Sequence, residues 1–245
     1  MKNKKENILI IGAGLCGSLL ALRLGQRGFQ VTLVEKRPDL RKIEQDAGRS
    51  INLAFSDRGM KAIKMVGLEN EVEKLCLPMI GRMIHDKMSN KFMSLYSGKE
   101  NKFINSISRP GLNMLLLDSA EKLPNVSLIF NQSCESLDFK NTTAVFKDYQ
   151  TKECSTYKAD VIFGTDGAGS VVRNNMFDDK SFRLSFSIDW LSHSYKELTI
   201  PASKSGNFQD EHKALHIWPR GENMLISLPN LDGSFTVTLF LAHQT

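Results

Sequence analysis

The glycine-rich segment 12–17 (GAGLCG) constrains the fold of this chain more than any other feature. It follows a short apolar run, 8–11, and opens a segment with leucines at helical spacing that Gly28 closes. A second run rich in β-branched residues, 30–35, comes next. Strand, glycine turn, helix and strand in this order predict a βαβ unit, from which parallel sheets with right-handed crossovers are built.

The three glycines of this turn have the spacing of a dinucleotide-binding site. Gly12 permits the tight turn, Gly14 lets the backbone approach a pyrophosphate, and Gly17 lets the helix pack closely on the strands. The helix N-terminus then offers N–H groups and a partial positive charge to the phosphates. Glu35 ends the second strand, where an acid accepts hydrogen bonds from ribose hydroxyls and repels a 2′-phosphate. The unit is therefore predicted to bind the ADP half of a dinucleotide without a 2′-phosphate.

A second motif occupies residues 160–173 (DVIFGTDGAGSVVR). An apolar strand runs into the turn Asp166-Gly167, so Asp166 lies at the carboxyl end of a strand, where α/β sheets place their ligands. Ser170 is predicted to cap the helix that follows. An Asp-Gly turn is common by itself, but in company with the glycine turn it favours FAD over NAD.

Arg82 and Tyr96 lie on two predicted strands, 79–85 and 91–96, outside the βαβ pattern. Arginine offers a planar fork that matches a carboxylate, and tyrosine adds a hydroxyl donor. The residue types alone favour an interpretation without a functional role, in which Arg82 is a surface residue and Tyr96 an edge aromatic. Helices are expected over 56–75, with a break at Gly67, and over 108–122, and the chain from 198 onward is expected to form strands.

Charge and composition exclude several classes of protein. The net charge of +5 is spread along the chain and interleaved with acids, which argues against a nucleic-acid-binding protein. The sequence contains no run of about 18 apolar residues, so no membrane-spanning helix is predicted. The cysteines show no metal-ligand spacing, and His212 and His216 precede a strand rather than share a helix, so no metal site is expected.

The chain as a whole resembles the FAD-dependent aromatic hydroxylases, the family that includes p-hydroxybenzoate hydroxylase. Within this family it is most similar to the members that act on L-kynurenine. Besides the glycine turn and the Asp166 turn, the segments that carry the resemblance run in order along the chain: GRSINLAFSDRG (48–59), GRMIHD (81–86), SISRPGLN (106–113), ELTIP (197–201), LHIWPR (215–220) and SFTVTLFL (234–241). From composition alone, the segment 48–56 is equally compatible with a connecting loop.

The resemblance implies an α/β fold with two domains. Residues 1–78 and 104–180 would form a Rossmann-like FAD-binding domain with a parallel sheet and helices. Residues 79–103 and 181–245 would form an antiparallel β-sheet substrate domain. Because the sequence stops after an apolar strand, this second domain is expected to be truncated at its C-terminal end, and the family's second flavin motif would lie beyond residue 245.

The resemblance also implies an activity. NADPH would reduce the bound flavin, and O₂ would then form a C4a-hydroperoxide that hydroxylates L-kynurenine to 3-hydroxykynurenine, a step of tryptophan catabolism. The cofactor carries the chemistry, so no protein nucleophile is expected. Two alternatives stay open: another FAD aromatic hydroxylase, and an incomplete FAD-binding fragment without activity. The expected location is the cytoplasm, or a membrane surface reached through a C-terminal segment that is not in this sequence.

Residue roles follow from matching positions in the resembling motifs. Arg82 and Tyr96 would bind the carboxylate of kynurenine, and an aromatic pocket would be lined by Ile226, Leu228, Thr238 and Phe240. The expected FAD contacts are Gly12, Gly14, Cys16, Gly17, Glu35, Lys36, Arg37, Ala54, Arg109, Cys134, Asp166 and Gly167.

Overall fold

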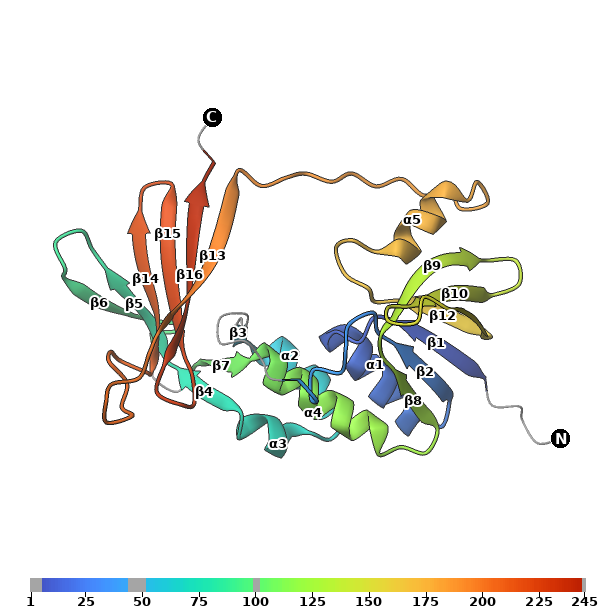
Figure 1. The fold of residues 1–245 in the computed structure, drawn as a ribbon. Coiled ribbons are helices and arrows are strands. Elements are labelled where there is room, and N and C mark those ends of the chain that lie inside the picture. The colour runs from blue at the N-terminus through green and yellow to red at the C-terminus, as the bar shows by residue number, and fades with distance from the viewer. Residues whose placement is uncertain (1–5, 44–51, 99–101, 244–245) are drawn as a thin grey trace. The chain divides into compact units, whose positions relative to one another are not determined.

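The computed structural model describes residues 6–43, 52–98 and 102–243. The chain forms two compact units (Figure 1), Met1–Glu44 with Asn113–Ser187 and Gln45–Leu112 with Ile188–Thr245. These boundaries differ from the predicted domains, since 52–78 and 104–112 belong to the second unit rather than to the dinucleotide-binding part.

The first unit contains the predicted βαβ unit. β1 (Asn7–Ile11), α1 (Leu15–Gln26) and β2 (Gln30–Val34) follow one another, and β1 pairs in parallel with β2. β12 (Val161–Gly164) lies on the other side of β1, and β8 (Val126–Ile129) lies beside β2, which gives a four-stranded parallel sheet. β1 is buried after its first residue, as expected of a strand in the interior of a parallel sheet.

A small antiparallel sheet completes the first unit. Its strands are β11 (Cys154–Lys158), β10 (Thr143–Asp148) and β9 (Gln132–Asp138). Phe146 of β10 is fully buried in one hydrophobic cluster with Leu9 and Ile11 of β1. The unit also contains α5 (Val171–Asp178) and most of α4 (Arg109–Glu121).

The second unit is built around a six-stranded sheet. The strand order is β13 (His193–Ile200), β16 (Phe235–Ala242), β15 (Asn223–Pro229), β14 (Ala214–Arg220), β5 (Gly81–His85) and β6 (Lys91–Leu95). Neighbours are antiparallel except β14 and β5, which are parallel. The predicted antiparallel sheet is therefore confirmed, with one parallel pair that was not foreseen and that joins two segments far apart in the sequence. Parallel neighbours need such long connections, and sequence patterns do not reveal them.

A three-stranded sheet and two short helices complete the second unit. The sheet consists of β3 (Asn52–Phe55), β7 (Ile104–Ser108) and β4 (Cys76–Met79). α2 (Asp57–Lys64) and α3 (Glu69–Glu73) lie on either side of Gly67, whose φ of 74° confirms the predicted helix break. The described part of the motif 48–59 consists of β3 and the start of α2, so it is not a connecting loop. Residues 48–51 lie outside the described residues.

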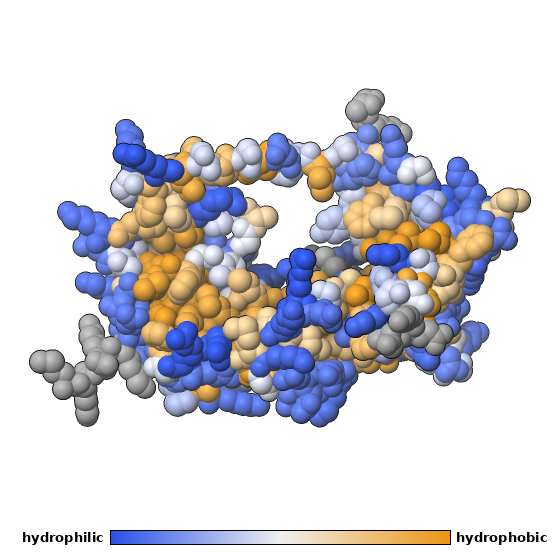
Figure 2. All heavy atoms as spheres, turned by 180° about the vertical axis from the view of Figure 1, so that it is seen from behind, coloured by the Kyte–Doolittle hydropathy of each residue, from blue (hydrophilic) through white to orange (hydrophobic). Residues whose placement is uncertain are grey.

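No helix among the described residues is long and apolar enough to cross a membrane. Apolar side chains reach the surface in places (Figure 2), and the most exposed large ones are Met88, Trp190 and Leu191. Single exposed apolar residues are normal on protein surfaces, so these identify no site by themselves.

Two buried histidines pair on one face of the six-stranded sheet. His85 Nε2 lies 2.8 Å from His216 Nδ1, and His216 Nε2 lies 2.7 Å from the carbonyl oxygen of Glu211. Trp218 stacks on His85, with 4.1 Å between ring centroids. One ligand atom each of His85, His216 and Asp210 lies within 4.8 Å of the others, but Asp210 is held by Lys91 at 2.9 Å. Because His85 Nε2 and His216 Nδ1 contact each other and Asp210 is bound to Lys91, the group is best described as a hydrogen-bonded pair beside a salt bridge.

This pair predicts a loss of stability in mild acid. Burial and the charge of His216 lower the pKa of His85 below 6.5; Asp210 raises it, and Lys91 and Arg220 lower it. The folded state then binds this proton less tightly than the unfolded chain, so the free energy of unfolding should fall as pH drops below 6.5, until His85 is protonated when folded. Urea denaturation at pH 7.5 and pH 5 measures the difference. The substitution His85→Leu should flatten the pH dependence, whereas His193→Gln, at an exposed histidine, should not; an unchanged slope in His85→Leu would disprove the assignment.

Candidate cofactor and substrate sites

Gly12 is the point where the two sequence motifs of the first unit meet. Its φ is 101°, and its N–H donates to the Val34 carbonyl at 2.7 Å. A Cβ atom added here would lie 2.6 Å from the Thr165 carbonyl oxygen and 2.7 Å from Asp166 Cα. Thr165 Oγ1 in turn donates to the Gly12 carbonyl at 2.7 Å. The glycine turn and the Asp166 turn are therefore one structure, and a side chain at position 12 is excluded by both space and backbone conformation.

Gly14 and Gly17 face different surroundings. A Cβ at Gly17 would collide with the carbonyl oxygen of Gly12 and lie 2.6 Å from Thr165 Oγ1, so this glycine allows close packing. A Cβ at Gly14 would meet nothing within 4 Å. The first helical bond of α1 runs from Ser18 N to Gly14 O, and its first turn contains no acid. Open space and free N–H groups at this helix N-terminus suit an anionic ligand.

Glu35 holds the glycine turn from β2. One carboxylate oxygen accepts from Ala13 N–H at 2.8 Å, and the other accepts from the Arg37 backbone and side chain at 3.1 and 2.7 Å. Burial raises the pKa of Glu35, but the hydrogen bonds from Arg37 and Ala13 outweigh it, and the pKa lies below 4.5. Glu35 is therefore ionised at neutral pH and has lone pairs left for ligand hydroxyls. Lys36 and Arg37 beside it are exposed.

Asn113 supports the same turn and was not singled out in the sequence. Its side-chain N–H group donates to the Ala13 carbonyl at 3.1 Å and to Ser18 Oγ at 3.0 Å, and the residue is buried. Asn113 closes the motif 106–113, so its place in that motif was the available signal. The contact joins residues about a hundred positions apart, and local patterns do not predict such pairs.

Asp166 caps the next helix. Its carboxylate accepts from Ser170 Oγ at 2.6 Å and from Val171 N at 2.7 Å, at the start of α5. Ser170 Oγ accepts from Arg173 N at 3.0 Å, which confirms the predicted helix cap. Gly167 has a φ of 85° and no neighbour near its missing Cβ. The carboxylate is thus engaged by α5, and Gly167 is the open part of this turn.

The other expected cofactor residues lie in both units. Cys134 of β9 is buried, and burial, with Asp166 and Glu135, raises the pKa of its thiol to about 12; Cys16 is exposed at the start of α1. Cys134 is thus a protonated core thiol, so only its backbone is suited to meet a ligand. Ala54 on β3 and Arg109 at the start of α4 are exposed and belong to the second unit.

The strand register brings the expected substrate residues to one face of the six-stranded sheet. Ile226 pairs with Thr238, Leu228 pairs with Thr236, and Met224 pairs with Phe240. Because side chains alternate along a strand, Ile226, Leu228, Thr238 and Phe240 share one face. On the other side of β15, Ile226 pairs with Ile217, which pairs with Ile84, and Leu215 pairs with Arg82. Arg82 therefore lies on this face as well.

Leu215 and Ile217 complete this face, although no role was predicted for either residue of the motif 215–220. Both lie on β14 between Arg82 and the residues of β15, and both are half-buried. The parallel pairing of β14 with β5 puts them there, and that pairing was not predicted.

Arg82 and Tyr96 are in contact. The guanidinium carbon lies 4.7 Å from the centre of the tyrosine ring, a cation–π geometry. The Tyr96 hydroxyl is buried and has no hydrogen-bond partner among the described residues. Burial raises the pKa of Tyr96, against the opposing charge of Arg82, so the phenol stays protonated and is a donor. The exposed guanidinium and the buried phenol are thus hydrogen-bond donors of two neighbouring side chains.

These two sites lie on a chain that matches the family described as FAD binding domain, over residues 5–225. This match covers most of the chain, and the chain belongs to this family. Its fold class is the predicted one, a Rossmann-like α/β unit with a second unit built on a β-sheet, and its cofactor is FAD.

Among curated proteins, the chain is similar to several kynurenine 3-monooxygenases. The enzyme from Myxococcus xanthus (strain DK1622) is 45% identical over 241 residues, which is 98% of this chain and 52% of the relative. That from Dictyostelium discoideum is 47% identical over 234 residues, 95% of this chain and 49% of the relative. The chain thus spans about half the length of the curated relatives it matches, and the resemblance inferred from its motifs is confirmed.

Solved structures confirm the fold. The p-nitrophenol 4-monooxygenase PnpA from Pseudomonas putida DLL-E4 has a TM-score of 0.77 at 16% identity, with 98% of this chain and 59% of that chain covered. The flavin-dependent monooxygenase PieE, in complex with FAD and substrate, has a TM-score of 0.75 at 16% identity, covering 100% of this chain and 44% of that chain.

The first unit fits the ADP half of FAD. The helix N-terminus at Gly14 is open and free of acids, and Glu35 is ionised beside it. These are the features that a pyrophosphate and an unphosphorylated ribose need.

Proposed function

We propose that the full-length protein is an FAD-dependent, NADPH-using monooxygenase that hydroxylates L-kynurenine to 3-hydroxykynurenine. Relatives named for this activity share 45% and 47% of the aligned residues with the chain. The single observation that carries the proposal is the contact of Arg82 with Tyr96 on the sheet face that also carries Leu215, Ile217 and Ile226. Two donors for a carboxylate (Arg82 and Tyr96, called the clamp below) next to a largely apolar wall suit an aromatic amino acid. The wall consists of Ile226, Leu228, Thr238 and Phe240.

In this proposal Arg82 and Tyr96 bind the substrate carboxylate. The guanidinium offers two parallel N–H donors, and the Tyr96 phenol, which has no partner among the described residues, adds an O–H donor. Leaving a buried polar group without a partner costs about 1–3 kcal/mol, and a bound carboxylate would remove that cost. Substrate binding would therefore be coupled to the relief of an unfavourable contact.

The apolar residues of the same face would position the aromatic ring and exclude water. Ile226 and Phe240 are half-buried, and Leu228 is 4% exposed. Thr238, which lies beside Ile226, is the polar member of the set. Because the wall offers few hydrogen bonds, the orientation of the ring would be set by shape and by the distant carboxylate clamp.

FAD, when bound, supplies the redox chemistry that activates O₂ with electrons from NADPH. Of the residues expected to hold it, Gly12, Gly14 and Gly17 give the pyrophosphate access to the start of α1. Glu35 would bind the adenosine ribose, with Lys36 and Arg37 beside it. The backbone at Cys16, Ala54 and Cys134, the Asp166-Gly167 turn and the Arg109 side chain are the remaining proposed contacts. The predicted division into an FAD-binding domain of residues 1–78 and 104–180 and a substrate domain of residues 79–103 and 181–245, and a cytoplasmic location, belong to the same proposal.

The test uses the full-length protein purified with its flavin. L-Kynurenine should accelerate NADPH oxidation and yield 3-hydroxykynurenine. A flavin-containing protein whose rate of NADPH oxidation is unchanged by kynurenine, but is raised by another aromatic acid, would support a hydroxylase with a different substrate. A protein that retains no flavin would contradict the proposal altogether.

A further inference from the structure

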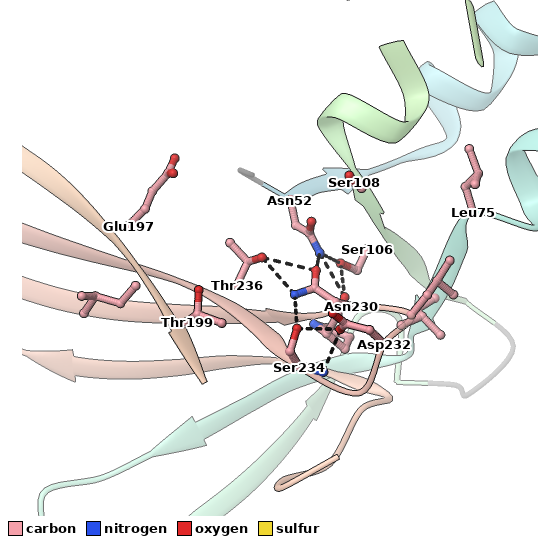
Figure 3. A pocket seen from close by; sticks show the side chains of 14 residues that line it. Asn52, Leu75, Ser106, Ser108, Glu197, Thr199, Asn230, Asp232, Ser234 and Thr236 are labelled. Atoms are coloured by element: carbon pink, nitrogen blue, oxygen red, sulfur yellow. Dashed lines mark hydrogen bonds between the residues drawn. The ribbon is translucent and has the colours of Figure 1, made fainter. Parts of the chain in front are cut away.

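A buried hydrogen-bond network joins the two sheets of the second unit (Figure 3), and none of the roles above uses it. It centres on Asn52, the first residue of β3, and its side chains line a cavity of about 370 Å³. The Asn52 side-chain nitrogen lies 3.0 Å from Ser106 Oγ, 3.1 Å from the Pro229 carbonyl oxygen and 2.5 Å from Asn230 Oδ1. Ser106 Oγ donates to the same carbonyl at 2.8 Å. The network therefore binds the three-stranded sheet to the turn that follows β15.

The acceptors around Asn52 determine which atom of its amide faces the network. The Pro229 carbonyl can only accept. Asn230 presents its oxygen, because its nitrogen donates to Ser234 Oγ at 2.8 Å and to Thr236 Oγ1 at 3.1 Å. The group of Asn52 that meets these oxygens is therefore N–H₂. A side chain that only accepts could not make these contacts.

Burial makes the network a rigid connection. Asn52 is 7% exposed and Ser106 is 2% exposed, so solvent does not compete for their hydrogen bonds. The oxygen of Asn52 is also buried, and it has no hydrogen-bond partner among the described residues. Since an unmatched buried acceptor costs stability, the amide is explained better by the geometry that its nitrogen fixes than by its contribution to stability.

One end of the network lies at the FAD contacts proposed for this unit. Ala54 follows Asn52 by two residues on β3 and pairs directly with Ser106 of β7. Arg109 follows Ser108, which pairs with Asn52. A shift of Asn52 or Ser106 would therefore move the backbone of both proposed contacts.

The other end of the network lies at the wall proposed for the substrate ring. Pro229 directly follows Leu228 on β15. Thr236 accepts from Asn230 and pairs with Leu228 across the ladder between β15 and β16. Thr236 also lies two residues before Thr238 on the same strand. The network thus connects the backbone of the wall to the backbone of β3.

We propose that Asn52 is a positioning residue that, through Ser106 and Asn230, sets the distance between the substrate wall and the flavin. This inference rests on the proposed function, because it requires FAD beside β3 and an aromatic ring on the wall. The Asn52 side chain contacts the network and not the clamp, so its loss should leave carboxylate binding intact. A displacement of the reacting groups by about 1 Å is enough to lower a rate by about 100-fold.

The test compares full-length, FAD-loaded Asn52→Ala and Ser106→Ala with the wild type. The first measurement is the productive fraction, which is the fraction of oxidised NADPH that yields 3-hydroxykynurenine. The second is titration of the flavin absorbance with kynurenine, which gives a dissociation constant and a difference spectrum. In Asn52→Ala the productive fraction should fall by about tenfold or more, while the dissociation constant stays within about threefold of the wild type. The difference spectrum should change in shape, because the ring lies differently against the flavin.

Ser106→Ala removes one hydroxyl and leaves Asn52 its contacts with Pro229 and Asn230, so it should show a smaller loss in the same direction. This milder variant decides the question if Asn52→Ala does not fold. A kynurenine dissociation constant that rises in parallel with the loss of product would show that the network supports the clamp, and would overturn the proposal.

Asn125→Ala is the matched control for a merely structural role. Asn125 is half-buried in the first unit, and its side-chain nitrogen donates to the carbonyl oxygens of Gly25 and Phe29 at 2.8 and 2.6 Å. Its loss should lower the resistance to urea without changing the productive fraction or the difference spectrum. The proposal is wrong if the folded variants of Asn52 and Ser106 match Asn125→Ala in both readouts.

The same experiment separates this inference from the proposed function. A wild-type protein that forms no 3-hydroxykynurenine would contradict the proposed function itself. A wild-type protein that forms it, with variants at Asn52 and Ser106 that form it in equal yield, would contradict only the positioning role.

Discussion

Replacing Gly14 with alanine should weaken FAD binding while leaving the protein folded. In the structure a Cβ at this position meets no atom within 4 Å, and the backbone is extended with a φ of −68°, which alanine adopts freely. The space it would fill is the one that the pyrophosphate needs. Forcing a methyl group into a packed contact costs about 1–3 kcal/mol, so FAD affinity should fall by about 5- to 150-fold.

Gly17→Ala is the matched comparison. Its Cβ would collide with the Gly12 carbonyl oxygen, which is backbone and cannot move aside, so this variant should lose stability as well as flavin, by about 3 kcal/mol. Flavin content after purification and urea denaturation of the flavin-free proteins separate the two effects. If Gly14→Ala keeps wild-type FAD affinity, the pyrophosphate does not lie at this turn.

Replacing Arg82 with alanine should raise the dissociation constant of L-kynurenine by about 10- to 150-fold, because a hydrogen-bonded charged partner contributes about 1.5–3 kcal/mol. FAD content should not change, since Arg82 is exposed on β5 and, among the described residues, its side chain forms no hydrogen bond or ion pair beside its contact with the Tyr96 ring. Titration of the flavin absorbance with kynurenine measures the constant.

Further variants of the clamp distinguish charge from geometry. Arg82→Lys keeps the charge but lacks the planar guanidinium, so its affinity for kynurenine should lie between those of the wild type and Arg82→Ala. Tyr96→Phe removes only the phenol donor and should have a smaller effect. Lys196→Ala is the control. Lys196 of β13 pairs with Leu239, which lies between Thr238 and Phe240 on β16, so its side chain lies on the sheet face opposite to that of Arg82. A loss of flavin in Arg82→Ala would show that the residue is structural.

The parts of the fold that the sequence predicts are those with local causes. Strand, glycine turn and helix follow one another within 8–28, and each is determined by residues within one turn of it. The cap at Ser170 and the break at Gly67 are of the same kind. The short strands β3 and β7 were not predicted, because sequences such as NLAF and INSIS show little β-branched alternation.

The parts that were missed depend on contacts between distant segments. His85 meets His216 across 131 positions, and Asn52 meets Asn230 across 178. Parallel pairing of β5 with β14 creates the first contact, and the turn after β15 creates the second. Neither pairing has a periodic signature. The cavity beside Asn52 could therefore be found only in the structure, whereas the Arg82–Tyr96 pair was suggested by the resemblance of its motifs.

The most direct test of the proposed hydroxylation determines the source of the oxygen atom that is added to the kynurenine ring. Full-length protein with FAD, NADPH and L-kynurenine would be incubated under isotope-labelled O₂, and the product analysed by mass spectrometry. The account predicts 3-hydroxykynurenine that carries one labelled oxygen on the ring, with its formation strongly reduced in Arg82→Ala. NADPH consumption that yields only hydrogen peroxide, or a product whose oxygen comes from water, would contradict it.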